Sequence, residues 1–174
     1  MKNIVVAYDM NGAIGSEGLM TWEGDQKDDM ARFRTLTIGG AVIMGSNTWN
    51  SLDPKFRPLP KRLNIVASRT LEPEPGDEFV VARSLPDAFH IAESANLEEI
   101  SVIGGGQIYE QAIDTVDRLF VTRIKTEIKN PDTFFPAFDA QKDWKLTYYK
   151  DNGPDARNKF GYTFMTYLRN NLSN

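Results

Sequence analysis

Apolar residues recur along the chain in short runs whose length is typical of β-strands. These runs cover residues 4–8, 41–44, 63–67, 79–82, 100–103, 119–122, 144–149 and 162–168. Helical patterns, with apolar residues three or four positions apart, lie between the earlier runs at 25–36, 47–52, 85–95 and 107–116. This alternation of strand and helix predicts a mainly parallel sheet that helices cover on both faces.

The last two strand runs differ from the earlier ones because no helical pattern separates them. Only the polar segment "KDNGPDARNK" joins them, which predicts an antiparallel pair connected by a loop. The stretches "DPKFRPLPKR" and "LEPEPGDE" are short and precede strands, so we interpret them as surface loops. A chain of 174 residues is long enough for one core and too short for two, so we expect one domain over 1–168 and a tail over 169–174.

The composition excludes several classes of protein. Hydrophobic residues at 41% and charged residues at 25% are usual for a globular chain, and no apolar run approaches the ~20 residues that span a bilayer. We therefore expect a cytoplasmic protein with no membrane partner. With no cysteine and a single histidine, His90, the chain has no disulfide framework, histidine metal site or serine triad. A net charge of −4 argues against a nucleic-acid partner.

A glycine triplet follows the strand run at 100–103 and precedes the helical segment "QIYEQAI". Glycines at such a junction let the backbone approach a ligand closely, and the following helix directs free N–H groups and a positive dipole at it. The pattern predicts a phosphate-binding turn, although a tight strand-to-helix connection would look the same. It is not a G-x-G-x-x-G fingerprint, because the third glycine would fall at Tyr109.

Two other strand runs end in small polar residues. "VIMGSNTW" places Gly45, Ser46, Asn47 and Thr48 at a helix start, and "IVASRT" places Ser68, Arg69 and Thr70 after a strand. Ligands of α/β proteins gather beyond the carboxyl ends of parallel strands, so these ends together predict one binding edge. Each taken alone is more typical of helix capping.

Two adjacent aspartates open the helical segment in "TWEGDQKDDMARF". A helix over 25–36 turns Asp29 toward the apolar face and Asp28, with Arg32, toward another face. The residues that share the face of Asp29 are Met30, Phe33 and Leu36. A carboxylate on an apolar face is costly unless a donor binds it, whereas Asp28 can stay in water at the favourable end of the helix dipole. We interpret Asp29 as a site residue and Asp28 as helix-terminus electrostatics; a plain cap is the alternative for Asp29.

These stretches together resemble the dihydrofolate reductase family over nearly the whole chain. The motifs occur in the family's order: "NGAIG", Trp22, "DDMARF", "VIMGSNTW", "PLPKR", "IVASR", "VIGGGQIYE", "LFVTRI" and "DTFFP". The resemblance implies one α/β domain with an eight-stranded, mostly parallel mixed sheet, an antiparallel C-terminal hairpin and about four helices. It implies NADPH-dependent reduction of 7,8-dihydrofolate to 5,6,7,8-tetrahydrofolate, with hydride transfer to pterin C6 and protonation at N5. It also implies a monomer that serves one-carbon metabolism.

The resemblance further implies roles for individual residues. Asp29 matches the carboxylate that binds the pterin, and a water admitted near Trp22 is the expected proton donor to N5. The catalytic set is Asp29, Trp22, Thr122 and Tyr109, and the substrate set is Val6, Ala7, Met30, Phe33, Leu52, Arg62 and Ile103. The cofactor set is Ala7, Ile14, Gly15, Met20, Gly45, Ser46, Asn47, Thr48, Ser68, Arg69, Gly105, Gly106, Gln107 and Ile108. Arg62 would bind the α-carboxylate of the glutamate tail, with Arg57 as second choice, and the Gly104–Gly105 peptide bond would be cis.

The chain departs from the family pattern at three places. Thr21 stands where proline is usual, two extra residues separate Trp22 from Asp29, and Ser46 replaces a frequent basic residue, so that Arg69 is the main cation for the 2′-phosphate. Two rivals share the scaffold: a reductase of riboflavin biosynthesis and a catalytically silent NADPH-binding protein. The first would not need the aspartate in 22–33, and the second would lack Asp29, Trp22 or Thr122, so the sequence favours dihydrofolate reduction.

Overall fold

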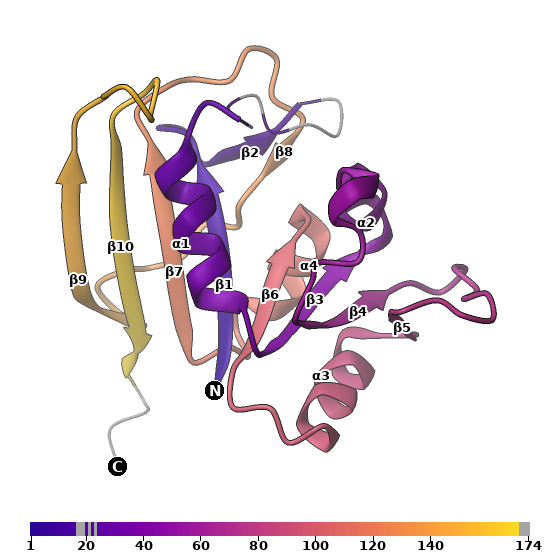
Figure 1. The fold of residues 1–174 in the computed structure, drawn as a ribbon. Helices are drawn as coiled ribbons and strands as arrows, with labels where there is room; N and C mark the ends of the chain where they lie inside the picture. The colour runs from indigo at the N-terminus through magenta and orange to yellow at the C-terminus, as the bar shows by residue number, and fades with distance from the viewer. Residues whose placement is uncertain (17–19, 21, 23, 171–174) are drawn as a thin grey trace.

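The computed structural model describes residues 1–16, 20, 22 and 24–170. Its centre is an eight-stranded sheet in the order β5-β4-β3-β6-β1-β7-β10-β9 (Figure 1). The strands are β1 (Lys2–Tyr8), β3 (Ala41–Gly45), β4 (Leu63–Ala67), β5 (Val80–Ala82), β6 (Ile100–Gly104), β7 (Arg118–Ile124), β9 (Trp144–Asn152) and β10 (Tyr162–Arg169). Each predicted strand run coincides with one of these strands. Thr21 and residues 171–174 of the predicted tail lie outside the described residues.

The direction of the strands confirms the predicted fold class. The six strands from β5 to β7 pair in parallel, while β10 runs antiparallel to both β7 and β9. A second, two-stranded sheet pairs β2 (Ala13–Gly15) with β8 (Thr133–Phe134). The sequence pattern does not predict this small sheet, because strands of two or three residues are too short to display an alternation of apolar and polar positions.

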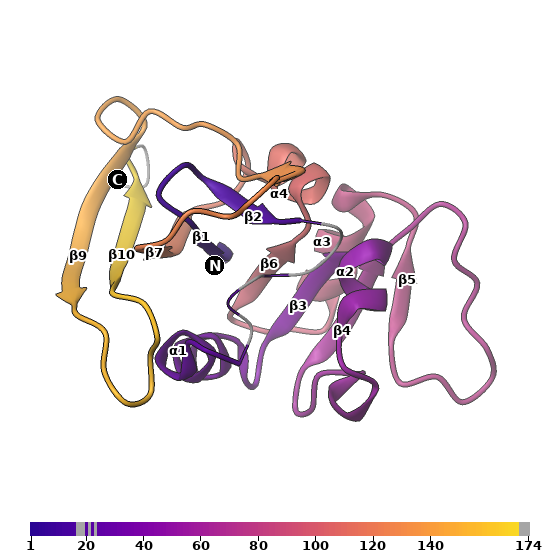
Figure 2. The same ribbon diagram turned by 90° about the horizontal axis from the view of Figure 1, so that it is seen from above.

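The described ranges contain four α-helices, which cover the sheet on both faces (Figures 1 and 2). They are α1 (Lys27–Thr37), α2 (Ser46–Ser51), α3 (Leu85–Ser94) and α4 (Gly106–Ala112), and a short 3-10 helix spans Pro54–Phe56. Alternate residues of β3 point to the two sides. Ile43 packs with residues of α3 and α4 in the larger core, whereas Val42 and Met44 pack with Trp49 of α2 and Phe33 of α1.

Helix α1 begins two residues later than the pattern predicts, because the loop between β9 and β10 binds the residues before it. The side chain of Gln26 is buried, accepts a hydrogen bond from the backbone N–H of Phe160 and donates one to its carbonyl. Helix α4 ends at Ala112, four residues before the predicted end at 116. None of the helices in the described ranges is long and apolar enough to cross a membrane.

Candidate active site

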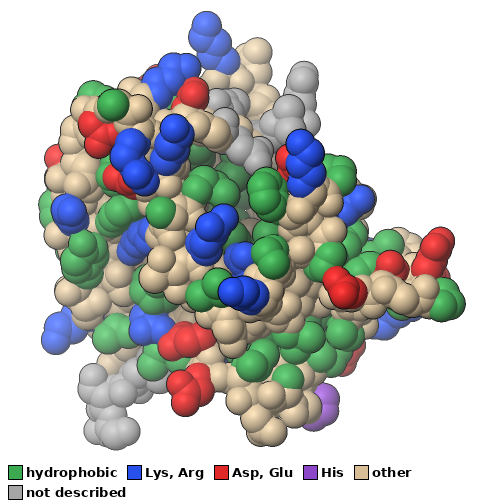
Figure 3. Space-filling view, viewed as in Figure 1, with side chains coloured by type: hydrophobic (Ala, Val, Ile, Leu, Met, Phe, Trp, Pro, Cys, Tyr) green, Lys and Arg blue, Asp and Glu red, His purple; other side chains and the backbone are tan. Residues whose placement is uncertain are grey.

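The carboxyl ends of the parallel strands meet at one edge of the sheet, as the sequence predicts. Gly45 at the end of β3 is level with Ala67 of β4, and Met44 is level with Gly104 of β6. On the other side of β6, Ala7 of β1 is level with Thr122 of β7. Figure 3 shows a hollow between α1 and α2 in which hydrophobic side chains gather. We call this hollow the cleft.

Asp29 lies on the face of α1 that is turned toward the sheet, as its helical position predicts. It is partly buried, and the hydroxyl of Thr122, itself buried on β7, donates a hydrogen bond to its carboxylate. Burial raises the pKa of Asp29, while the Thr122 hydrogen bond and the positive charge of Arg32 act in the opposite direction, and the net shift is upward. A carboxylate whose pKa is shifted by burial and by specific partners is a candidate functional residue.

Tyr109 of α4 lies beneath the same carboxylate. Its side chain is 5% exposed and its hydroxyl donates to the Val5 carbonyl oxygen at 2.9 Å. Burial, with the negative charge of Asp29 as a second cause, raises the pKa of this phenol, so that it stays neutral. Tyr109 is therefore a neutral hydrogen-bond donor that joins α4 to β1.

The inward face of α1 differs from the predicted one at two positions. Arg32, which the pattern placed with Asp28 on another face than Asp29, is turned toward the sheet: its Nη1 donates to the Val121 carbonyl at 2.8 Å and its Nη2 to the Met165 carbonyl at 3.0 Å. Residue 32 is one turn after Asp29, so the two share a face. Met30, predicted to share that face, has 43% of its surface exposed, and its place in the substrate pocket stays a prediction.

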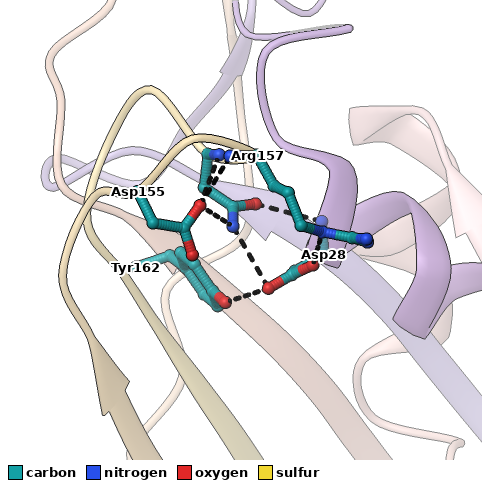
Figure 4. A network of polar contacts seen from close by, with 5 residues as sticks. Asp28, Asp155, Arg157 and Tyr162 are labelled. Carbon is teal, nitrogen blue, oxygen red and sulfur yellow. Dashed lines mark hydrogen bonds and ion pairs between the residues drawn. The ribbon is translucent and has the colours of Figure 1, made fainter.

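Asp28 is not simply solvated at the helix start, which corrects the sequence interpretation (Figure 4). Tyr162 donates its hydroxyl to the Asp28 carboxylate at 2.7 Å, Asn158 donates its amide at 3.1 Å, and the Nε of Arg157 lies at 3.0 Å. The side chain is 31% exposed. These contacts, the Tyr162 hydrogen bond foremost, lower the pKa of Asp28. Asp28 thus ties α1 to the β9–β10 loop.

Replacing Asp28 by asparagine should destabilise the fold at neutral pH by about 1–2 kcal/mol, because charge-assisted hydrogen bonds are lost. A carboxyl whose pKa is lowered in the folded state stabilises above its unfolded pKa, about 3.9, and loses that effect as the pH falls through the folded value. The difference between parent and variant in urea unfolding should therefore shrink below about pH 4. The control is Asp25→Asn, which removes an exposed ion pair with Lys159 and should change little. A difference in unfolding free energy between parent and Asp28→Asn that is the same at neutral pH and below about pH 4 would contradict this role of Asp28.

Trp22 packs in a small core next to the cleft. Its side chain is 1% exposed and contacts a cluster formed by Ala13, Ile124, Ile128 and Tyr162. Among the residues that the structure describes, its indole Nε1 has no hydrogen-bond partner. A buried N–H without a partner is costly unless a water or ligand accepts from it, so this donor is available to a bound molecule.

The glycine turns predicted to bind the cofactor contact one another. A Cβ on Gly45 would lie 3.1 Å from the Cγ1 of Ile108, and one on Gly105 would lie 3.3 Å from the Oγ1 of Thr48. A Cβ on Gly106 would lie only 2.9 Å from the Cγ2 of Thr133. The peptide bond Gly104–Gly105 is cis, as predicted. Bare backbone is therefore required where the ends of β3 and β6 meet.

The segment 132–136 closes over this turn, a role that sequence reasoning did not assign to it. A cavity of about 290 Å³ is lined by Gly106, Gln107, Glu110 and residues 132–136. Ile14 of β2 lies within 4.0 Å of the position of a Cβ on Gly106, and Gly15 follows it in the strand. This segment stands out in the sequence only as the motif "DTFFP". Nothing in the motif indicates that the segment lies against the glycine turn.

The other predicted cofactor residues differ in their exposure. Ser46 and Thr48 are partly buried and Asn47 is exposed at the start of α2, while Gln107 is exposed and Ile108 partly buried in α4. The hydroxyl of Ser68 accepts from the backbone N–H of Leu71 at 3.1 Å, and Arg69 beside it is exposed. Met20 is 37% exposed. Their cofactor contacts stay predictions.

The predicted substrate residues are mostly packed in the interior of the fold. Phe33, Leu52 and Ile103 pack against one small core that contains Met44 and Trp49. In the first strand, Val6 is 4% exposed and Ala7 is partly buried. Their contacts with a substrate stay predictions.

Arg62 stands at the C-terminal end of α1. Its Nη1 donates to the Thr37 hydroxyl at 2.9 Å, its Nε donates to the Pro60 carbonyl at 3.0 Å, and its guanidinium lies 5.8 Å from the ring centre of Phe33. Burial, with the charge of Arg34 as a second cause, lowers its pKa from the ordinary arginine value. Arg57 instead lies 5.5 Å from the ring of Trp49, at a separate hollow of about 380 Å³ that includes Glu72, Glu74, Asp77 and Glu78.

The chain's single histidine, His90, and the aromatic Tyr167 of β10 have other surroundings. His90 is exposed on α3, and within the described ranges no three His, Cys, Asp or Glu side chains gather as a metal site. The ring of Tyr167 packs against Phe138 at 5.4 Å between ring centres.

Comparison with known proteins gives a consistent family assignment. A family model described as dihydrofolate reductase matches residues 1–169. The chain is 35% identical to the dihydrofolate reductase of Bacillus subtilis, covering 99% of this chain and 97% of that protein, and 34% identical to that of Sus scrofa, covering 97% and 98%. A structure of dihydrofolate reductase from Enterococcus faecalis complexed with NADP(H) and RAB-propyl superimposes with a TM-score of 0.84 at 28% identity, covering 98% of this chain and 97% of that one.

Proposed function

The chain belongs to the dihydrofolate reductase family, and on that premise we propose that it carries out the family's reaction in the cleft between α1 and α2. The reaction is the NADPH-dependent reduction of 7,8-dihydrofolate to 5,6,7,8-tetrahydrofolate, which feeds one-carbon metabolism. The observation that carries the proposal is a partly buried carboxylate, Asp29, that accepts from Thr122 and interacts with Tyr109, whose hydroxyl lies 3.2 Å from the position of a Cβ on Gly104.

Asp29 and Arg62 bind the two ends of the substrate in this proposal. The carboxylate of Asp29 accepts hydrogen bonds from the 2-amino group and ring N3 of the pterin, a bidentate match for a planar heterocycle. The apolar side chains of Phe33, Leu52 and Ile103 bury the ring faces. Arg62 offers a planar guanidinium to the α-carboxylate of the glutamate tail, and its contacts with Thr37 and Pro60 orient it in advance.

The residues at the carboxyl edge fit a dinucleotide, because the glycine turns at the starts of α2 and α4 bring bare backbone together at one place. The residues that hold it are Gly45 to Thr48 and Gly105 to Ile108 at the pyrophosphate, Ser68 and Arg69 at the 2′-phosphate, and Ala7, Ile14, Gly15 and Met20 at the nicotinamide. When bound, NADPH supplies the hydride for pterin C6. The chain's own contribution is alignment of the two rings and exclusion of water.

Protonation of pterin N5 requires a donor that the protein positions. We propose that a water supplies this proton and that the unpartnered Nε1 of Trp22 binds the water or the pterin in the cleft. Asp29 assists from a distance, because its negative charge stabilises the pterin when N5 carries the extra proton.

The proposal is tested by following the loss of NADPH absorbance when dihydrofolate is added to the purified protein. We expect rapid oxidation of NADPH that needs dihydrofolate, a slower reaction with folate, and a weaker one with NADH because Arg69 selects the 2′-phosphate. The ribosylated pyrimidine of riboflavin biosynthesis is the competing substrate. Oxidation with that compound but not with dihydrofolate would assign the rival activity, and binding of NADPH without turnover would identify a silent relative.

We also propose that residues 1–168 act as a single unit, as a monomer in the cytoplasm. The proposal is supported by a site whose carboxylate, threonine, tyrosine and glycine turn all come from one chain. Light scattering on the eluting peak of a gel-filtration column, with and without NADPH, measures the mass directly. A mass of two chains would reject the monomer.

A further inference from the structure

Arg32 is a partly buried cation that the function proposed above does not use. Its Nη1 donates to the Val121 carbonyl of β7 at 2.8 Å, and its Nη2 donates to the Met165 carbonyl of β10 at 3.0 Å. The guanidinium carbon also lies 4.5 Å from the ring centre of Phe164. An arginine that is desolvated in this way loses hydration, and a neighbouring anion offsets that loss.

The neighbouring anion is Asp29. Arg32 Nη1 approaches the Thr122 hydroxyl oxygen to 3.4 Å, and the same hydroxyl donates to the carboxylate of Asp29. The two charged residues are three positions apart on one face of α1 and attract one another, which favours the charged form of each. Arg32, Thr122 and Asp29 therefore form one connected group across α1 and β7.

Among the described residues, the other groups that interact with Asp29 are neutral. Thr122 of β7 is neutral, and Tyr109 of α4 is held neutral by burial. On its far side Arg32 interacts with Tyr148 of β9, and Asp28, the next residue along α1, is bound to Arg157 in the β9–β10 loop. Among the interactions described for Asp29, Arg32 is the positive charge.

We propose that Arg32 is a positioning residue for the reaction, because its guanidinium fixes the Thr122 hydroxyl and β7 under Asp29 and places a positive charge beside that carboxylate. The kinetic part of this inference rests on the proposed function of the cleft. Arg32 touches neither ring of the reacting pair, so it acts only through Asp29. Its positive charge favours the ionised form of the carboxylate, against the burial that favours the neutral form.

A purely structural role, in which Arg32 merely joins β7 to β10, makes a different prediction. If Arg32 only joins these strands, its loss lowers the free energy of unfolding and leaves the pKa of Asp29 unchanged. Loss of the charge raises the pKa at which Asp29 titrates. Arg32→Gln keeps N–H donors but removes the positive charge, and Arg32→Lys keeps the charge but removes the planar guanidinium. The two variants therefore separate these roles.

The direct measurement is the ¹³C NMR titration of the Asp29 carboxyl in protein labelled with [4-¹³C]aspartate, assigned by its disappearance in Asp29→Asn. We expect the midpoint to rise in Arg32→Gln and to stay near the parent value in Arg32→Lys. The control, Lys27→Gln, removes the same charge from an exposed position on the same helix and should leave the midpoint unchanged. An unmoved midpoint in Arg32→Gln, or equal shifts in the Gln and Lys variants, would overturn the proposal.

Kinetics supply the second readout. One pKa unit changes the ionised fraction about tenfold only at pH values below the midpoint. The acid side of the pH profile for turnover of dihydrofolate should therefore be displaced in Arg32→Gln in the same direction as the titration, with a fall of up to about tenfold per pKa unit on that side. Thermal melting confirms that each variant is folded. The titration uses the protein without substrate, so it tests the Arg32–Asp29 coupling even if dihydrofolate proves not to be reduced. A displaced titration with an unmoved pH profile would reject the positioning role.

Discussion

Replacing Asp29 by asparagine is expected to reduce turnover of dihydrofolate at neutral pH by at least about a hundredfold, with little change in NADPH affinity. The amide has nearly the shape of the carboxylate, so the packing of α1 on the sheet should survive. It cannot carry the negative charge that stabilises a protonated pterin. Its NH₂ group would also face an N–H donor of the pterin ring, so that no hydrogen bond forms there. Steady-state kinetics across the pH range, with NADPH binding measured by fluorescence, checks both parts.

The same variant should not be less stable than the parent at neutral pH. Burial raises the pKa of Asp29 in the folded state, so the charged carboxylate opposes folding as the pH rises through the unfolded and then the folded pKa. An uncharged amide removes that penalty. A lower melting temperature together with the lost turnover would point to unfolding instead of catalysis.

A matched control and a low-pH measurement make the test specific. Asp25→Asn removes the same charge from a position just before α1 whose carboxylate binds the exposed Lys159, and it should keep normal turnover. At low pH, where more of the substrate is already protonated, Asp29→Asn should regain part of its activity. Unchanged turnover at neutral pH would remove Asp29 from the catalytic set.

The sheet and the inward position of Asp29 were predictable because both depend on short-range periodicity. Buried strands appear as apolar runs, and the helical repeat alone turns residue 29 toward the sheet. The network of Asp28 was not predictable, because its partners Arg157, Asn158 and Tyr162 lie 129 to 134 positions away in the sequence. Only the fold brings the β9–β10 loop to the start of α1.

Arg32 illustrates a second limit of sequence reasoning. It is three positions after Asp29 and four after Asp28, so the helical repeat alone does not decide its face, and hydropathy ranks arginine as an outward residue. The structure overrides this preference because two strand carbonyls, an aromatic ring and an anion together replace the lost water. Each is contributed by a different position of the chain, so no local pattern records the combination.

Replacing Arg62 by methionine is expected to raise the KM for dihydrofolate by about tenfold to a hundredfold with little change in kcat, the effect of losing about 1.5–3 kcal/mol of charge-assisted hydrogen bonding. The tail carboxylate is remote from the transferred hydride, so its anchor binds ground state and transition state alike. Methionine keeps an unbranched apolar stem against Phe33. Steady-state kinetics at saturating NADPH measures both constants.

A substrate without the glutamate tail decides whether Arg62 acts through that carboxylate. With such a reduced pterin the parent and Arg62→Met should have equal KM values, because the group that distinguishes them is missing. Arg57→Met is the matched control, since that guanidinium lies against Trp49 at the separate hollow and its loss should leave the KM for dihydrofolate near the parent value. Arg62→Lys should fall between parent and methionine, because a point charge replaces a planar fork. If Arg57→Met raised the KM and Arg62→Met did not, the anchor would be assigned to Arg57, and the orientation of Arg62 by Thr37 and Pro60 would serve the fold alone.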